Sequence, residues 1–166
     1  AKDPKATMEY WEPEGRGSSG YDNVKMPDDL PFSKPPYGRI TAIDMSQGTT
    51  LWVAADGDGV RNSRQLKGLH LPMLGVRSRP APLITKTLLF LGEGSDAIFG
   101  GGSSPYDWGT KFSPYDKGTG SVLWETTLPS GTTGGPMTYR YKGKQYIVVA
   151  VGSKKDAPQL VALTLP

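Results

Sequence analysis

One short pattern occurs twice in this chain and constrains the fold more than any other feature. The pattern Asp-x-x-x-Gly-x-x-x-Trp is found at 44–52 and again at 116–124. In both copies an apolar segment ends at the Asp, and another begins just after the Gly. A repeated local pattern indicates one structural unit used more than once, and such units bury their apolar faces by stacking on neighbours. The sequence therefore predicts stacked units that belong to a larger assembly.

The residue types in this pattern suit a turn that joins two β-strands. An Asp carboxylate at a strand end can accept hydrogen bonds from backbone N–H groups of the turn. Gly permits the positive φ that a tight turn requires, and a Trp ring offers up to about 250 Å² of surface for burial between neighbouring sheets. We therefore interpret Asp44, Asp116, Trp52 and Trp124 as architectural residues rather than catalytic ones.

Short apolar segments separated by loops predict an all-β fold. The 166 residues include 22 Gly and 15 Pro, which favours many turns between short strands, and no segment shows sustained helical periodicity. Nine strands are expected, in groups of two, four and three, at 39–43, 51–53, 83–85, 88–91, 111–113, 122–126, 137–141, 145–151 and 160–165. If the repeated unit is a four-stranded antiparallel sheet, the chain holds half a unit, one whole unit and three strands of another.

Composition divides the chain and excludes several classes of protein. Residues 1–37 are rich in Pro, Gly and charged side chains, so an irregular arm is expected there, followed by one β-domain over 38–166. No window of 18 apolar residues occurs, which argues against a transmembrane helix. The net charge is only +3, and no dense basic run indicates a nucleic-acid partner. The absence of Cys excludes disulfides and thiolate chemistry.

Several runs together resemble a known family. Residues 42–52 fit the motif Ala-x-Asp-x-x-x-Gly-x-x-x-Trp completely, and the second copy has Pro114 in place of Ala. Further runs are 34–44, 123–131, and 135–139 with 143–149. The chain resembles the C-terminal part of the pyrroloquinoline-quinone (PQQ)-dependent dehydrogenases, of the membrane-bound glucose dehydrogenase and soluble alcohol dehydrogenase type. The "tryptophan docking" motif also occurs in non-enzymatic propellers, and the Pro-Met-Thr-Tyr and Gly-Lys-Gln-Tyr runs are far more specific to the dehydrogenases.

The resemblance implies a fold and an activity. The fold would be a partial β-propeller, the last two to three blades of an eight-bladed quinoprotein propeller with four-stranded antiparallel blades. The activity would be oxidation of a sugar or alcohol hydroxyl by hydride transfer to PQQ, beside a calcium ion, in the periplasm. Electrons would pass to ubiquinone or a cytochrome. The cofactor carries the redox chemistry, and the protein orients and polarises the reactants.

The resemblance places few functional residues in this chain. No segment matches the catalytic Asp or the calcium ligands of the family, so no catalytic or metal-binding residue is expected here. Cofactor contacts are expected at most from Arg79 and Pro80, at the entry to the complete blade, and from Gly152 and Ser153, after the strand at 145–151. The chain alone is expected to be inactive and to need the remaining blades, or another copy of itself, as partners.

An alternative function stays open at this stage: a propeller that serves only as a scaffold or as an assembly or binding module. Local motifs were also considered as binding sites. Asp56-Gly57-Asp58-Gly59 resembles part of a calcium loop but lacks the further spaced oxygens and the closing Glu. An ordinary turn is the preferred interpretation of that segment. His70, the only His, has no paired carboxylate in its surroundings and is interpreted as a loop residue.

Overall fold

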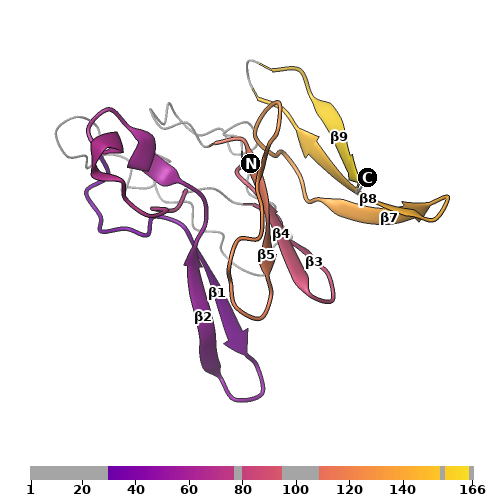
Figure 1. The fold of residues 1–166 in the computed structure, drawn as a ribbon, viewed down its shortest axis with the longest axis horizontal. Coiled ribbons are helices and arrows are strands. Elements are labelled where there is room, and N and C mark those ends of the chain that lie inside the picture. The colour runs from indigo at the N-terminus through magenta and orange to yellow at the C-terminus, as the bar shows by residue number, and fades with distance from the viewer. Residues whose placement is uncertain (1–29, 77–79, 95–108, 154–155, 165–166) are drawn as a thin grey trace, which may run out of the picture.

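Three antiparallel β-sheets make up the computed structural model, which describes residues 30–76, 80–94, 109–153 and 156–164 (Figure 1). The sheets contain two, four and three strands in the orders β1-β2, β3-β4-β5-β6 and β7-β8-β9. The strands are β1 Arg39–Asp44, β2 Thr49–Ala55, β3 Leu83–Ile84, β4 Leu88–Gly92, β5 Lys111–Asp116, β6 Thr126–Thr127, β7 Met137–Tyr141, β8 Lys144–Val151 and β9 Gln159–Thr164. The predicted all-β class and the grouping of two, four and three strands are confirmed for this part of the chain.

Helical structure in the described ranges is limited to two short 3-10 turns, η2 Gly59–Asn62 and η3 Lys67–Leu69. Both lie in the long connection between the first and second sheets. Most of the expected N-terminal arm, residues 1–29, lies outside the described residues. The division of the chain at residue 37 therefore stays a prediction.

The sixth strand is shorter than the sequence predicts. The residue types at 122–126 predict a full outer strand. In the structure β6 covers only Thr126–Thr127, and Val122 forms an isolated bridge with Tyr115. The cause lies in β5, where the Pro114 carbonyl accepts the Leu123 N–H at 3.0 Å. In a regular antiparallel pair, the residue whose carbonyl accepts a hydrogen bond from the outer strand also donates its own N–H to that strand. Pro114 has no N–H to donate, so the pairing stops there.

Both copies of the repeated pattern form the expected turn. Asp44 Oδ1 accepts the Ser46 N–H at 2.8 Å, and Asp116 Oδ1 accepts the Thr119 N–H, also at 2.8 Å. The glycines have positive φ, 68° for Gly48 and 75° for Gly120. Hydrogen bonds to the carboxylate hold the pKa of Asp44 below its usual value, with the Ser46 side chain contributing most. The predicted roles of the Asp and Gly positions are confirmed.

The four-stranded sheet lies between the other two and is buried on both faces (Figure 1). Two apolar clusters hold the three sheets together. One joins Phe90, Phe112 and Leu128 to Val149 and Val151; the other joins Leu89, Leu91 and Tyr115 to the partly buried Ile40 and Trp52. The outward faces of the two end sheets are open, since large apolar side chains there, including Leu51 and Met137, are 62% and 56% exposed.

Trp52 connects the first sheet to the second. Its Nε1 donates a hydrogen bond to the Lys117 carbonyl oxygen at 3.0 Å. Its ring lies so close to Gly120 that a Cβ atom there would come within 2.5 Å of ring atom Cε3. The Trp of the first repeat thus packs on the turn of the second. Trp52 therefore contacts both sheets, whereas Trp124 is 44% exposed, and the tryptophan-docking arrangement of a propeller stays a prediction.

Candidate functional site

Polar side chains gather where β2, β4 and β8 end, at the edge opposite the Asp turns. We call this the loop edge, and it comprises the described residues 56–58, 93–94, 130–132, 152–153 and 156. Thr132 joins the sheets there, because it bridges Gly94 on one side and Val151 on the other. β2 and β4 belong to different sheets, and these sheets pack on one another so that residues just beyond the two strands meet at this edge, where the Asp58 N–H bonds the Glu93 carboxylate.

Glu93, directly after β4, is the centre of the loop edge and is only 6% exposed. Its carboxylate accepts the Asp58 N–H at 3.3 Å and the Lys111 N–H at 2.9 Å. Two glycines with positive φ, Gly57 and Gly109, lie against the same carboxylate, and a Cβ atom at either would overlap it. Burial raises the pKa of Glu93, and the two backbone hydrogen bonds oppose that rise.

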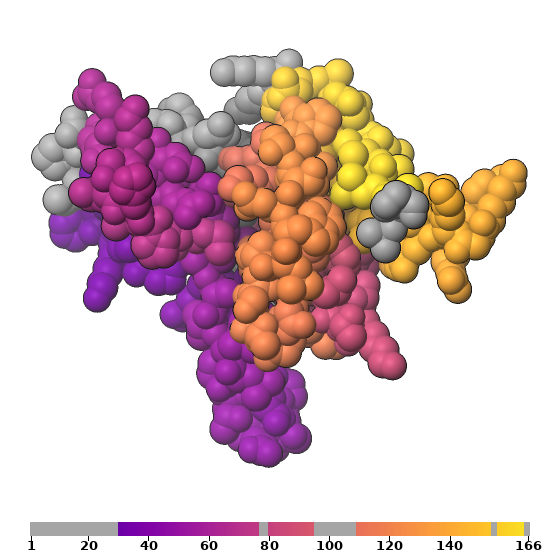
Figure 2. Space-filling model, viewed as in Figure 1, coloured from indigo at the N-terminus to yellow at the C-terminus, as the bar shows by residue number. Residues whose placement is uncertain are grey.

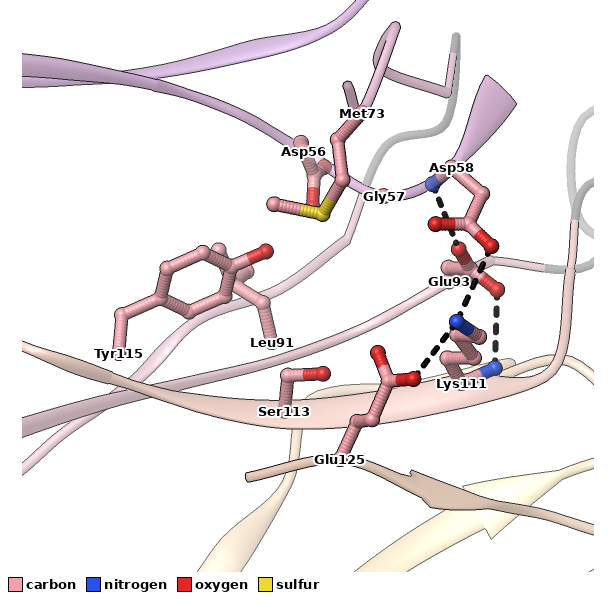
Figure 3. A pocket seen from close by; sticks show the side chains of 10 residues that line it. All are labelled: Asp56, Gly57, Asp58, Met73, Leu91, Glu93, Lys111, Ser113, Tyr115 and Glu125. Carbon is pink, nitrogen blue, oxygen red and sulfur yellow. Dashed lines mark hydrogen bonds and ion pairs between the residues drawn. The ribbon is translucent and has the colours of Figure 1, made fainter. Parts of the chain in front are cut away.

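Asp56, directly after β2, is a second buried carboxyl group, 8% exposed. Burial, and then the charge of Glu93, raise its pKa to about 6. The ring of Tyr115, from β5, lies beside it (Figure 3). Burial raises the pKa of the Tyr115 hydroxyl, and the charges of Asp56 and Glu93 raise it further. The Asp56 carboxyl group is therefore suited to hold a proton in mildly acidic solution.

Lys111 supplies the cation on the other side of the cluster, as Figure 3 shows. Its Nζ lies 3.0 Å from Asp58 Oδ2 and 2.8 Å from Glu125 Oε1. Asp58 is also paired with Arg61 at 2.6 Å. Asp58 therefore binds two cationic side chains of this chain itself, which is a structural use of the segment that resembled part of a calcium loop.

The cavity between these side chains is small and acidic. Its volume is about 10 Å³, roughly the space that one water molecule needs. Such a space can hold a proton or a water molecule next to Asp56 and is too small for a sugar, an alcohol or a quinone. Among the described residues, no three or more His, Cys, Asp or Glu side chains are grouped so that they could hold a metal ion.

A line of hydrogen bonds leads from Glu93 to the loop after β8. The Glu93 carbonyl oxygen accepts the Thr132 N–H at 2.9 Å, and the Gly152 N–H is donated to the Gly131 carbonyl at 3.0 Å. Asp156 then closes the loop, because its Oδ2 accepts the hydroxyls of Ser130 at 2.9 Å and Ser153 at 2.7 Å. The loop edge is thus one connected polar network across the three sheets.

The expected cofactor contacts fall in two separate places. Gly152 and Ser153 lie in the network just described, where Gly152 is buried. Pro80 lines a larger, mostly apolar hollow of about 430 Å³ between β1-β2 and β3-β4, together with Ile40, Trp52 and Leu89. Arg79 lies outside the described residues.

Sequence reasoning missed the buried group of Glu93, Asp56, Tyr115 and Lys111. A signal existed for two of these residues, since Asp56 and Glu93 each follow a predicted strand that ends in apolar residues. A carboxyl group directly after an apolar strand is a candidate for a buried position at a sheet edge. Their meeting depends on how two sheets pack, which the local pattern does not reveal.

Comparison with known proteins identifies what this chain is similar to. Residues 2–147 match the family model described as the β-propeller domain of PQQ-dependent glucose, ethanol and alcohol dehydrogenases. The quinoprotein glucose dehydrogenase of Gluconobacter oxydans is 31% identical over 147 residues, which are 82% of this chain and 16% of that protein. A probable quinate dehydrogenase (quinone) of Xanthomonas campestris is 30% identical over 144 residues, 82% of this chain and 17% of that protein.

A solved structure, the quinohemoprotein alcohol dehydrogenase from Comamonas testosteroni, is also similar. It aligns with 81% of this chain at 22% identity and a TM-score of 0.47, and the chain covers 17% of it. This chain spans about one sixth of the length of the glucose dehydrogenase and of the quinate dehydrogenase named above.

Proposed function

Because the chain belongs to the family of PQQ-dependent glucose, ethanol and alcohol dehydrogenases, within their β-propeller domain, we propose that it contributes blades to such an enzyme. The enzyme would oxidise a sugar or alcohol hydroxyl group, and PQQ, when bound, would accept the hydride. The observation that carries this proposal is the family match over residues 2–147. A propeller that serves only as a scaffold is the alternative, and the repeated Trp pattern alone would suit it equally well.

The described residues do not by themselves fit PQQ, which carries three carboxylate groups. The buried cavity is lined by Asp56, Glu93 and other acids, which would repel an anion. The Gly152 N–H and the Ser153 hydroxyl already bind groups of this chain. We therefore propose that Pro80, Gly152, Ser153 and, outside the described residues, Arg79 form only the rim of a cofactor site. The rest of that site, with the calcium ion, would come from other blades.

The remaining blades are the partners that this proposal requires. The first sheet has two strands in the described part of the chain, whereas the second has four. Beside the first sheet lies the hollow of about 430 Å³, lined mainly by apolar side chains. We propose that two inner strands of a complete blade cover this hollow and leave its border at Pro80 open toward the cofactor. The open outward faces of the first and third sheets would then contact the neighbouring blades on either side.

Location and electron acceptor belong to the same proposal. We place the enzyme in the periplasm, with ubiquinone or a cytochrome as the acceptor of electrons. No helix in the described ranges has the length and apolar character to cross a membrane.

A replacement experiment tests the proposal. Residues 34–164 would replace the matching segment of the Gluconobacter glucose dehydrogenase, and PQQ-dependent dye reduction would be measured with glucose, quinate, glycerol and ethanol. We expect activity from the chimera and none from this chain alone. A chimera that folds, shown by circular dichroism, but fails to bind PQQ would favour the scaffold alternative. If the chimera does not fold, the gene sequence that flanks this segment distinguishes the enzyme from the scaffold. We expect it to encode further blades in frame, with a catalytic Asp and calcium ligands, and their absence would favour the scaffold.

A further inference from the structure

The face of β5 that meets the first sheet contains one small polar side chain, Ser113. It lies between Lys111 and Tyr115 on that face, because alternate residues of a strand share a face. Across the sheet it pairs with Leu91 of β4. Leu91 and Tyr115 belong to the apolar cluster that contacts Trp52 of the first sheet. Ser113 is only 8% exposed, so its hydroxyl needs a hydrogen-bond partner within the protein.

Ser113 and Asp56 are both buried polar side chains without such a partner. Within the part of the chain that the structure describes, no group forms a hydrogen bond with the Ser113 hydroxyl or with the Asp56 carboxyl group. The backbone of Asp56 is fully bonded, since its N–H is donated to the Gly38 carbonyl and its carbonyl accepts the Val76 N–H. Each residue is 8% exposed. Two such groups at one place indicate a polar ligand between them.

Both side chains line the cavity of about 10 Å³, as Figure 3 shows. A water molecule needs a space of about 10–15 Å³ and two to four polar partners. Tyr115, on the same wall, supplies a third partner. Its hydroxyl oxygen accepts the Gly57 N–H, and its own proton can be donated into the cavity. The space and the polar groups around it therefore match one water molecule.

We propose that one ordered water molecule occupies this cavity and bridges Asp56 to Ser113. The water donates hydrogen bonds to the Asp56 carboxyl group and the Ser113 hydroxyl oxygen, and it accepts the Tyr115 hydroxyl proton. Asp56 follows β2 and Ser113 lies in β5, so the water connects the first sheet to the second. This connection is separate from the hydrogen bond of Trp52 at the turn of the second repeat.

The site lies between two parts of this chain and not on an outward face. In the space-filling view the connection after β2 and strand β5 lie side by side (Figure 2), and Lys111 Nζ of β5 is paired with Asp58 Oδ2 at 3.0 Å. Further blades around the chain would enclose the cavity more deeply. The water site is also independent of the dehydrogenase activity, because a scaffold propeller would hold the same water.

Two other occupants fit the cavity less well. A metal ion needs several anionic or imidazole ligands, and the described residues contain no group of three or more His, Cys, Asp and Glu that could hold one. Lys111 already supplies the positive charge at this place. A proton on Asp56 alone would leave the Ser113 hydroxyl without a partner. One water molecule satisfies both side chains.

A high-resolution crystal structure of the whole chain tests the proposal directly. We expect one density peak within about 2.7–3.2 Å of both the Asp56 carboxyl group and Ser113 Oγ. Crystals soaked in rubidium chloride should show no anomalous signal at that peak. An empty cavity, a direct Asp56–Ser113 hydrogen bond, or a peak that takes up rubidium would overturn the proposal. If the chain does not fold alone, the chimera with residues 34–164 gives the same observation, whether or not it oxidises a substrate.

Oxygen-17 magnetic relaxation dispersion, which counts long-lived internal waters, is the second measurement. Ser113→Val removes one partner and fills space with methyl groups, so we expect one long-lived water fewer than in the parent chain. If Ser113→Val does not fold, Ser113→Thr adds one methyl group to the same wall and gives the same test.

Ser130→Ala is the control, because Ser130 is 2% exposed and its hydroxyl is donated directly to Asp156 Oδ2, away from the cavity. We expect the parent number of waters in this variant. A Ser113 variant that keeps the parent number, or an equal loss in Ser130→Ala, would overturn the proposal.

Discussion

The indole of Trp52 donates its hydrogen bond to the carbonyl oxygen of Lys117, 3.0 Å away and in a different sheet. Lys117 follows Asp116 in the turn of the second repeat, so the Trp of one repeat is bound by the turn of the next. The hydrogen bond satisfies the polar end of a large side chain whose ring packs against the next sheet. A repeat of this kind connects neighbouring sheets in a fixed order, as a stack of blades requires.

We expect Trp52→Phe to destabilise the chain more than Trp124→Phe. The first change removes the hydrogen bond to Lys117 and part of the ring contact with Gly120, which together should lower the free energy of unfolding by about 1–3 kcal/mol. Trp124 is 44% exposed, so its replacement is a matched control with a smaller effect. Urea unfolding followed by circular dichroism measures both. Similar losses in the two variants would contradict the role assigned to Trp52.

The pKa of Asp56 predicts how stability changes with pH. Its pKa is raised from 3.8 to about 6 in the folded chain, so the folded state holds a proton that the unfolded state releases. This contribution to stability is present below pH 3.8 and is lost as the pH rises through about 6. We expect Asp56→Asn to be more stable than the parent by about 2 kcal/mol at pH 7.5, and the difference to disappear near pH 4.

Asp44→Asn is the control with the opposite sign. The pKa of Asp44 is lowered by its turn hydrogen bonds, so its contribution is present at neutral pH and lost as the pH falls through that lowered value. Urea midpoints between pH 3 and pH 8 measure both variants. A pH profile of Asp56→Asn that runs parallel to that of the parent chain would show that Asp56 does not hold the proton.

Most of the fold was predictable because its signals are local. Alternating or continuous apolar runs between Gly- and Pro-rich loops gave all nine strands, and the Asp and Gly of each repeat predicted the turn. The one correction, at 122–126, arises where Pro114 in a neighbouring strand lacks an N–H. The loss of pairing depends on which strand lies beside 122–126. The residue pattern of 122–126 by itself does not contain that information.

The candidate site was less predictable, because it depends on contacts between sheets. Asp56 and Glu93 are 37 positions apart in the sequence, on either side of a long loop, and their meeting follows from the packing of the first sheet on the second. Gly152 and Ser153 were selected by resemblance, and their hydrogen bonds to Gly131 and Asp156 could not be read from the residues. Whether they contact a cofactor stays a prediction.

Gly109→Ala tests how closely the chain encloses Glu93. Gly109 has a φ of 78°, and a Cβ atom there would overlap the Glu93 carboxylate. Gly143 is a matched control, because its φ is 79° and a Cβ atom would meet nothing within 4 Å. Both changes strain the backbone by about 1–2 kcal/mol. We expect Gly109→Ala to lower the free energy of unfolding by at least about 2 kcal/mol more than Gly143→Ala, through overlap and lost hydrogen bonds. Equal losses would mean that Glu93 moves aside freely.

Ser130→Ala tests whether the loop after β8 is held by the polar network. Ser130 is 2% exposed, and its hydroxyl donates to Asp156 Oδ2 at 2.9 Å, so its loss removes a buried hydrogen bond to a carboxylate. The expected effect is about 1–3 kcal/mol of stability and faster hydrogen exchange at Gly152 and Ser153. Ser46→Ala removes a similar hydroxyl bond to Asp44 at an exposed turn, and it should change stability by less than about 1 kcal/mol. Unchanged exchange at Gly152 in Ser130→Ala would show that the loop is positioned by the Gly131 hydrogen bond alone.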